Sequence, residues 1–230
     1  MNADFTDNST LQERYDEARR ALRSMNETQI RWAQEEFLAL GEYKNSALLA
    51  ERCRMFLDFT VGNIVTFGSY EGKPIRWKVM ESSGRMRMLI AADVVAHQPY
   101  TAMRVDTYWQ SATLRKWLNG EFLNEAFTPE QRSMIFATRR SNEPNAVYGS
   151  NAGLPTMDKV FILSHREAEQ YLPEESDRNL GAWWWLRTPG CNLLTAESVY
   201  TDGSIYVPGV NLDYTEGGVR PALWLLVRDA

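Results

Sequence analysis

The sequence of 230 residues predicts an α+β protein, in which a small all-helical segment precedes a domain of helices packed on antiparallel sheets. Apolar residues recur at helical spacing through residues 1–59 and alternate, as in strands, from Val61 onward. Within the second part, helix signals occupy the middle and strand signals occupy both ends, an order typical of α+β folds. We therefore expect two units, residues 1–59 and residues 60–230.

The composition argues against several classes of function. With 44% hydrophobic residues, the chain can bury a sizeable core. The net charge is −5 and no basic run occurs, so a nucleic-acid partner is not expected. No apolar stretch approaches the roughly 20 residues that cross a bilayer, so no membrane span is expected. The first residues lack the pattern of a signal peptide, which predicts a cytoplasmic protein and leaves open display on a surface or a phage by another route.

Residues 1–59 indicate three amphipathic helices. Thr10 and Glu13 form a capping box for the first, and Thr28 can cap the second, which Gly41 is placed to end. The expected apolar stripes are Leu11, Tyr15, Ala18, Leu22 and Met25, then Ile30, Ala33, Phe37 and Leu40, then Ala47, Ala50, Cys53 and Leu57. The segment resembles half of a tetratricopeptide-like hairpin without a second copy. Its core is small, so we expect it to pack on the following domain or to mediate oligomers.

The next segment indicates a three-stranded meander. The run "GNIVTFG" (62–68) is strand-like, and apolar and basic residues alternate in "PIRWKVM" (74–80) and again in "RMRMLIA" (85–91). In residues 74–80 this pattern predicts one buried face and one solvent-exposed face. The turn "SSG" (82–84) separates the two runs.

Helix signals return in the middle of the domain. The predicted helix starts are Ser111, Thr128 with Gln131, and Ser164 with Glu167. The first of these helices is expected to end near Gly120. Residues 139–158 are rich in Asn, Gly, Pro and Ser and predict a long loop, and loops of this length are often functional.

The last third indicates strands again. Asp202-Gly203 is a strong hairpin signal between "AESVY" (196–200) and "SIYVPG" (204–209). The run "GVRPALWLLV" (218–227) is long enough for a central strand, with Pro221 at its start or at a bulge because proline has no N–H for the ladder. In "GAWWWLRTPG" (181–190), alternation on a strand points Trp184 away from Trp183 and Trp185.

Residues that could support catalysis are sparse. Cys53 and Cys191 lie far apart in the sequence, which predicts two free thiols. His97 and His165 stand in no metal-binding or catalytic pattern, and His165 is expected to face solvent. No nucleophile–base pair, phosphate-binding loop or metal cluster is recognisable, so we expect no catalytic residue, no metal and no cofactor. A satisfied ion pair or a backbone contact is expected for Arg187.

Five motifs occur in the order of a known family. They are "FGSYEGKPIRWKV" (67–79), "SATLRKWLNGEFLNEAF" (111–127), "DKVFILS" (158–164), "WWLRTPG" (184–190) and "GGVRPALWL" (217–225). Together they resemble a bacterial family of uncharacterised domains with a C-type-lectin-like fold, akin to formylglycine-generating-enzyme-like domains and to the variable proteins of diversity-generating retroelements. The resemblance covers residues 61–228. It implies that strands near Ile64 and Leu223 pair, that two helices flank the sheets, and that the late hairpins and loops face a ligand.

The resemblance also implies a ligand-binding face between the motifs of the last third. These stretches are rich in Tyr, Asn and Asp, a mixture that also serves antibody paratopes. The predicted face, as we call it below, consists of Trp183, Asn192, Leu194, Tyr200, Tyr206, Asn211, Asp213 and Tyr214. Trp183 precedes the family motif, and a surface platform and a core filler remain equal interpretations of it.

We thus expect a non-catalytic ligand-binding module whose partner is a protein or a glycan surface, in one form a retroelement-diversified variable protein. Two alternatives remain, an enzyme-like relative of formylglycine-generating enzymes and an interaction protein acting through its helical appendage. The tripeptide Glu143-Pro144-Asn145 matches the calcium- and sugar-binding EPN of mannose-type lectins. Its partner tripeptide Trp-Asn-Asp is missing, and we interpret the match as a coincidence.

Overall fold

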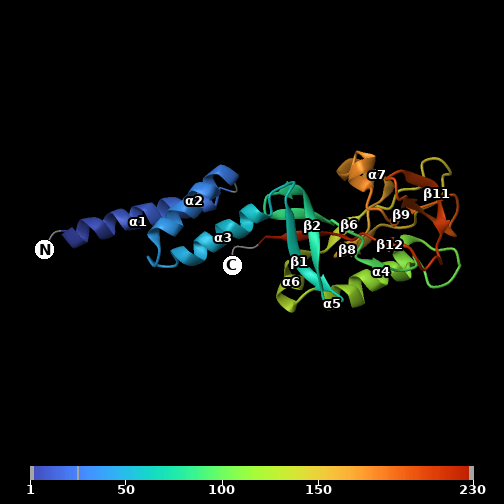
Figure 1. Cartoon of the computed structure of the whole chain (residues 1–230), viewed down its shortest axis with the longest axis horizontal. Helices are drawn as coiled ribbons and strands as arrows, with labels where there is room; N and C mark the ends of the chain where they lie inside the picture. Colours follow the sequence, from blue (N-terminus) through green and yellow to red (C-terminus); the bar gives the residue numbers. More distant parts are fainter. Residues whose placement is uncertain (1–2, 25, 228–230) are drawn as a thin grey trace.

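The computed structural model describes residues 3–24 and 26–227, with side chains from Ser9 onward. It confirms the α+β class, because three helices precede a set of mainly antiparallel sheets (Figure 1). The helices extend from one end of the molecule, and strand β11 (Ile205–Asn211) lies at the opposite end. The boundary between the two predicted units at residue 59 stays a prediction.

The N-terminal segment consists of α1 (Ala3–Leu22), α2 (Glu27–Leu40) and α3 (Ser46–Asp58), with α2 packed between the other two. The predicted apolar stripe of α2 is confirmed, since all four of its members are buried. Gly41 ends α2 with φ +54°, a backbone conformation that side chains disfavour, as its sequence position predicted.

Two predicted helix starts are wrong. The helix α1 is already formed at Ala3, so Thr10 lies inside it. Asn26 caps α2, because its side-chain oxygen accepts a hydrogen bond from the Gln29 N–H at 3.2 Å, and Thr28 falls in the first turn. Asparagine is a better N-cap residue than threonine, which favours Asn26 over Thr28. Met25, expected on the first stripe, lies outside the described residues.

The buried face of α3 is rotated from the predicted one. Ala47 is exposed and Leu57 is only half-buried, whereas Leu49 and Phe56 are buried. The rotated face contacts the sheet domain at one end of the helix. At the C-terminal end, the ring of Phe56 lies 4.5 Å from the guanidinium carbon of Arg87 in the sheet domain.

The first sheet begins with the predicted meander. Strands β1 (Ile64–Tyr70), β2 (Lys73–Ser83) and β3 (Met86–Ala91) pair in sequence order, and β13 (Ala222–Leu226) follows β3. The short strands β5 (Ile135–Phe136) and β8 (Val160–Phe161) pair with the other side of β13.

The expected pairing of the strands near Ile64 and Leu223 is wrong. Ile64 pairs with Lys78, and Leu223 pairs with Leu89 and Val160. The meander has two outer edges, at β1 and at β3, and β13 adds to the edge of β3 while β1 remains an edge strand.

Strand β3 is buried on both faces. Arg87, which alternates with apolar residues, is only 2% exposed. Its Nε donates to the Phe59 carbonyl at 2.8 Å and its Nη1 to the Gly84 carbonyl at 2.7 Å. The guanidinium therefore joins the end of the helical segment to the sheet, and its burial is compensated by these acceptors.

The middle of the domain is helical. The 3₁₀ turn η1 (Trp109–Ser111) leads into α4 (Thr113–Trp117), the π-helical turn η2 (Leu118–Phe122) and α5 (Leu123–Ala126). This helix passes through Gly120 without ending, and Ala112, not Ser111, is its N-cap residue. The two predicted capping boxes are confirmed at α6 (Pro129–Met134) and α7 (His165–Tyr171). The short helix α8 (Glu175–Arg178) follows.

The second sheet has the order β11-β10-β9-β12-β4. Its other strands are β10 (Thr195–Val199), β9 (Trp184–Pro189), β12 (Gly218–Val219) and β4 (Ala96–His97). The chain passes from β12 in this sheet to β13 in the first sheet at Pro221, where neither ladder needs its missing N–H.

All six residues of β9 are buried, so both of its faces are core. Trp184 and Trp185 are fully buried, and their indole nitrogens donate to the carbonyls of Arg178 at 3.0 Å and Gln98 at 2.9 Å. The tryptophan run is thus mainly structural, because each buried indole finds an acceptor.

Candidate functional site

The hairpin of β10 and β11 carries the centre of the predicted face. Its turn forms at Asp202-Gly203 as predicted, and Asp202 fixes the turn by accepting from the Ser204 N–H at 2.9 Å and from its hydroxyl at 2.7 Å. These hydrogen bonds lower the pKa of the Asp202 carboxyl.

The hairpin brings Tyr200 and Tyr206 together. Their ring centroids lie 4.8 Å apart with an interplanar angle of 17°, a stacked pair, and Tyr200 keeps 39% of its surface exposed. Partial burial raises the pKa of Tyr200, and the neighbouring Tyr206 and the Asp202 carboxylate add to this rise. The stack creates a flat aromatic surface on the hairpin.

At the other end of the hairpin, the residues before β10 and after β11 hold one another. The Asn192 side-chain oxygen accepts from the Leu194 N–H at 2.8 Å, and the Leu194 carbonyl accepts from Leu212 at 3.1 Å. Leu212 is buried and anchors the segment between Asn211 and Asp213. Asn192 and Asp213 are exposed, and Leu194 and Asn211 are half-buried.

Trp183 and Tyr214 form a second aromatic pair. Trp183 precedes β9, is half-buried and packs edge-on against Trp185 at 4.9 Å. Tyr214 is 54% exposed and approaches Trp183 at 6.5 Å. Trp183 thus reaches from the core to the surface, so its two interpretations are compatible.

Every member of the predicted face is exposed or half-buried. The structure brings its members together in local groups: Tyr200 with Tyr206, Trp183 with Tyr214, and Asn192 with Leu194. That these groups form one continuous exposed face stays a prediction.

Two loops beside the hairpin carry exposed apolar residues that were not predicted individually, although the second loop lies within the long loop predicted at residues 139–158. We call them the apolar loops, and their residues are Met103 and Val105, 69% and 50% exposed, and Val147, Tyr148 and Leu154, 70%, 49% and 68% exposed. The first loop joins the hairpin where Thr107 N–H donates to the Leu193 carbonyl at 3.0 Å. One sequence signal could have indicated these loops. Their apolar residues follow neither helical nor strand spacing, and they stand in segments rich in turn residues.

The second apolar loop is pinned by Asn145, which is 1% exposed. Its side-chain nitrogen lies 3.0 Å from the Pro189 carbonyl, 2.8 Å from Glu197 Oε1 and 3.0 Å from the Val207 carbonyl. Its oxygen accepts from the backbone N–H groups of residues 147 and 148, both at 2.9 Å. The oxygen that would bind calcium in an EPN site is therefore already engaged with the protein, which supports coincidence as the reason for the match.

Glu197 also contacts His165, which is not simply solvent-facing as the sequence suggested. His165 Nδ1 lies 2.5 Å from Glu197 Oε2, and its Nε2 lies 3.3 Å from Glu169 Oε1. The hydrogen bond to Glu197 raises the pKa of His165, and burial raises the pKa of Glu197. This arrangement orients the imidazole, but its recorded partners in the described chain are carboxylates and not a nucleophile.

The remaining polar groups of this region have structural partners. Arg187 is 3% exposed, pairs with Glu167 through both terminal nitrogens, and donates to the Ile162 carbonyl at 3.0 Å, so the predicted ion pair is confirmed. Cys191 is exposed beside Thr195 at 3.7 Å, and Cys53 is buried in α3, so the two thiols are free.

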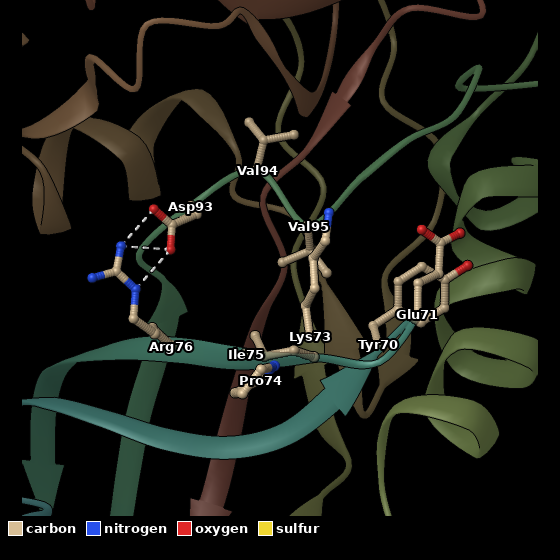
Figure 2. A pocket seen from close by; sticks show the side chains of 9 residues that line it. All are labelled: Tyr70, Glu71, Lys73, Pro74, Ile75, Arg76, Asp93, Val94 and Val95. Carbon is tan, nitrogen blue, oxygen red and sulfur yellow. Dashed lines mark hydrogen bonds and ion pairs between the residues drawn. The ribbon is translucent and has the colours of Figure 1, made fainter.

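A separate hollow of about 260 Å³ lies beside the β1–β2 turn (Figure 2). Arg76 and Asp93 close one end through an ion pair with Nη2–Oδ1 at 2.8 Å and Nε–Oδ2 at 3.0 Å. Lys73 reaches from the turn toward Val95, and no described side chain pairs with its ammonium. The residues that line the hollow come from the β1–β2 hairpin and from residues 93–95, and they include no base–nucleophile pair.

The fold and the surface together define the class of protein: an α+β domain that presents a late hairpin and two apolar loops at the end opposite a helical segment (Figure 1). A family model described as "Domain of unknown function (DUF6273)" matches residues 85–227, and the chain belongs to this family. No curated protein and no solved structure matches the chain. Within the described residues, no helix has both the length and the apolar character needed to span a membrane.

Proposed function

We propose that the chain is a non-catalytic binding module whose ligand docks on the predicted face and the adjacent apolar loops. The observation that carries this proposal is the contrast along the last third of the chain. The scaffold residues of β9 and β12 are all buried, whereas every member of the predicted face keeps solvent contact. Exposed Tyr and Trp side chains provide a large contact area at low entropic cost.

The apolar loops strengthen the proposal. They carry five apolar or aromatic side chains that are 49–70% exposed and both bond to one hairpin, and apolar groups gathered on one surface mark interaction sites. A protein surface is the favoured partner, since the hairpin and loops present apolar and aromatic groups and form no deep acid–base cavity.

We also propose that the domain has the C-type-lectin-like architecture. The family match begins at residue 85, just before β3, and ends at residue 227, just after β13. These two strands pair with each other. Pairing of the first and last strands of the matched segment supports the architecture, and β1 and β2 extend the same sheet beyond β3. In such a domain the hairpin and loops occupy the position of a ligand face, and a retroelement-diversified variable protein is one form of this proposal.

The enzyme-like alternative has less support. Formylglycine-generating chemistry uses paired cysteines, and Cys53 lies in the helical segment while Cys191 lies beside the hairpin. The alternative of an interaction protein acting through its helices rests on exposed Trp32 and Leu38 in α2, and deletion of residues 1–59 distinguishes it.

The test replaces Tyr200, Tyr206, Asn211 and Tyr214 together by serine. Because all four keep solvent contact, we expect a folded protein with a cooperative melt and lost binding to the partner that the parent captures. The control is Trp32→Ser with Leu38→Ser, two exposed apolar residues of α2 outside the predicted face. Unfolding of the fourfold variant, or unchanged capture by it, would contradict the proposal.

A further inference from the structure

The turn that carries Tyr200 is held in a fixed position against α8. The Tyr200 N–H donates to the Ser204 carbonyl at 2.8 Å. Gly203 adopts φ +93° and packs so closely that a Cβ atom would lie 1.9 Å from the Glu175 carbonyl oxygen. Arg178 is 7% exposed and donates its Nε to the Gly203 carbonyl at 2.8 Å. A group that binds at this turn therefore meets a preorganised surface.

The turn presents one open aromatic face and one free carboxylate oxygen. The stack with Tyr206 covers one side of the Tyr200 ring and leaves its other side available to a flat group. Asp202 is exposed, and its Oδ1 accepts both hydrogen bonds from Ser204. Among the described residues, none donates a hydrogen bond to its Oδ2.

The exposed charged side chains between β9 and Arg220 have one sign. Between Arg187 and Arg220 the chain contains no lysine or arginine, and the acids Asp202, Asp213 and Glu216 are all exposed. Three arginines that flank this stretch, Arg178, Arg187 and Arg220, are 7%, 3% and 3% exposed and donate to protein acceptors, whereas exposed Arg104 lies in the first apolar loop, which joins the hairpin at the end away from the turn. Such a surface attracts a cationic partner and repels phosphate groups.

We propose that Tyr200 and Asp202 bind an arginine side chain of a protein partner, with the guanidinium stacked on the open ring face and paired with Asp202 Oδ2. The proposal rests on the proposed function, because it names the chemistry of the partner for the same surface. A guanidinium is flat, always charged and weakly hydrated, so it can stack and pair at once. A lysine ammonium can pair with Asp202 but has no flat face to stack.

The experiment titrates the full chain with three capped heptapeptides that differ only in carrying three arginines, three lysines or three citrullines. Binding is followed by the amide NMR shifts of Gly203 and Ser204. We expect the arginine peptide to bind at least threefold more tightly than the lysine peptide and the citrulline peptide not to bind. Raising the salt concentration should weaken the arginine peptide, because the pair is exposed.

Two variants locate the site. Asp202→Asn keeps the side-chain oxygen that accepts from Ser204 and retains a good turn sequence, so it should fold and weaken the arginine peptide at least fivefold. Tyr200→Leu should remove the preference for arginine over lysine. The control is Glu42→Gln, which removes an exposed acid of the helical segment and should change nothing.

Three outcomes would overturn the inference: no shift of the turn amides, equal affinity of the arginine and lysine peptides for the parent, or undiminished binding by Asp202→Asn. The proposed function is judged separately by the fourfold serine variant. Loss of the captured partner in that variant, together with any of these three outcomes, would leave the proposed function standing and remove the arginine site.

Discussion

Replacing Asn145 by alanine is the sharpest test of how the second apolar loop is held. Asn145 is 1% exposed and joins the loop to β9, β10 and β11 at once. Alanine removes the whole amide while keeping the backbone, so the bonds from this side chain are lost without new ones forming.

The expected cost follows from those bonds. The two amide hydrogens serve a charged acceptor, Glu197, and the carbonyls of Pro189 and Val207. A hydrogen bond to a charged group contributes about 1.5–3 kcal/mol, and a neutral one about 1 kcal/mol. The N–H groups of Val147 and Tyr148 can bond water instead, since both residues are exposed. The free energy of unfolding should fall by about 3 kcal/mol, or roughly 6–12 °C in Tm for a chain of this size.

The assay is urea unfolding followed by tryptophan fluorescence, because Trp184 and Trp185 lie in the adjacent strand. Asn151→Ala, an exposed asparagine of the same loop, is the control and should cost under about 1 kcal/mol. A loss below about 1 kcal/mol in Asn145→Ala would refute the pinning role.

A chelator should leave the parent's Tm unchanged, and a large drop would revive the calcium interpretation of Glu143–Asn145.

Three further predictions concern groups elsewhere in the chain. Arg187→Met removes a buried guanidinium and leaves its carboxylate partner without its main counter-ion, so it should cost about 3–5 kcal/mol in urea unfolding. Arg76→Met, in an ion pair whose side chains are 56% and 55% exposed, should cost under about 1 kcal/mol, and similar losses would contradict this contrast. The pKa of His165 is raised in the folded state by its hydrogen bond to a buried carboxylate, so the native state binds this proton more tightly than the unfolded chain does. The resulting stability is present below about pH 6.5 and is lost as the pH rises through the folded pKa, so the unfolding free energy of the parent should fall more steeply from pH 6 to 8 than that of His165→Gln. Equal slopes would show that this pair does not contribute. Burial raises the pKa of the Cys53 thiol to about 11, so exposed Cys191 should react alone with a disulfide reagent at pH 8, and two fast equivalents would show that α3 opens.

Much of the candidate site followed from local sequence. The Asp202-Gly203 turn fixed the hairpin, and its register then placed Tyr200 diagonally across from Tyr206, within reach for stacking. The apolar loops were not predicted residue by residue. Their positions depend on single distant anchors, such as Asn145 reaching β9 and β11, and no local pattern encodes such a contact.

The sequence by itself determined the features that a few neighbouring residues can make. The capping boxes at Thr128 and Ser164 and the alternation in β2 are formed by bonds or faces within one element. Tertiary structure alone decided that Arg87 is buried and that β13 adds to β3. It also decided that both faces of β9 are core. The physical reason is that burial of a second face and the choice of a strand edge depend on which distant elements remain to cover them, and one element's residue pattern does not contain that information.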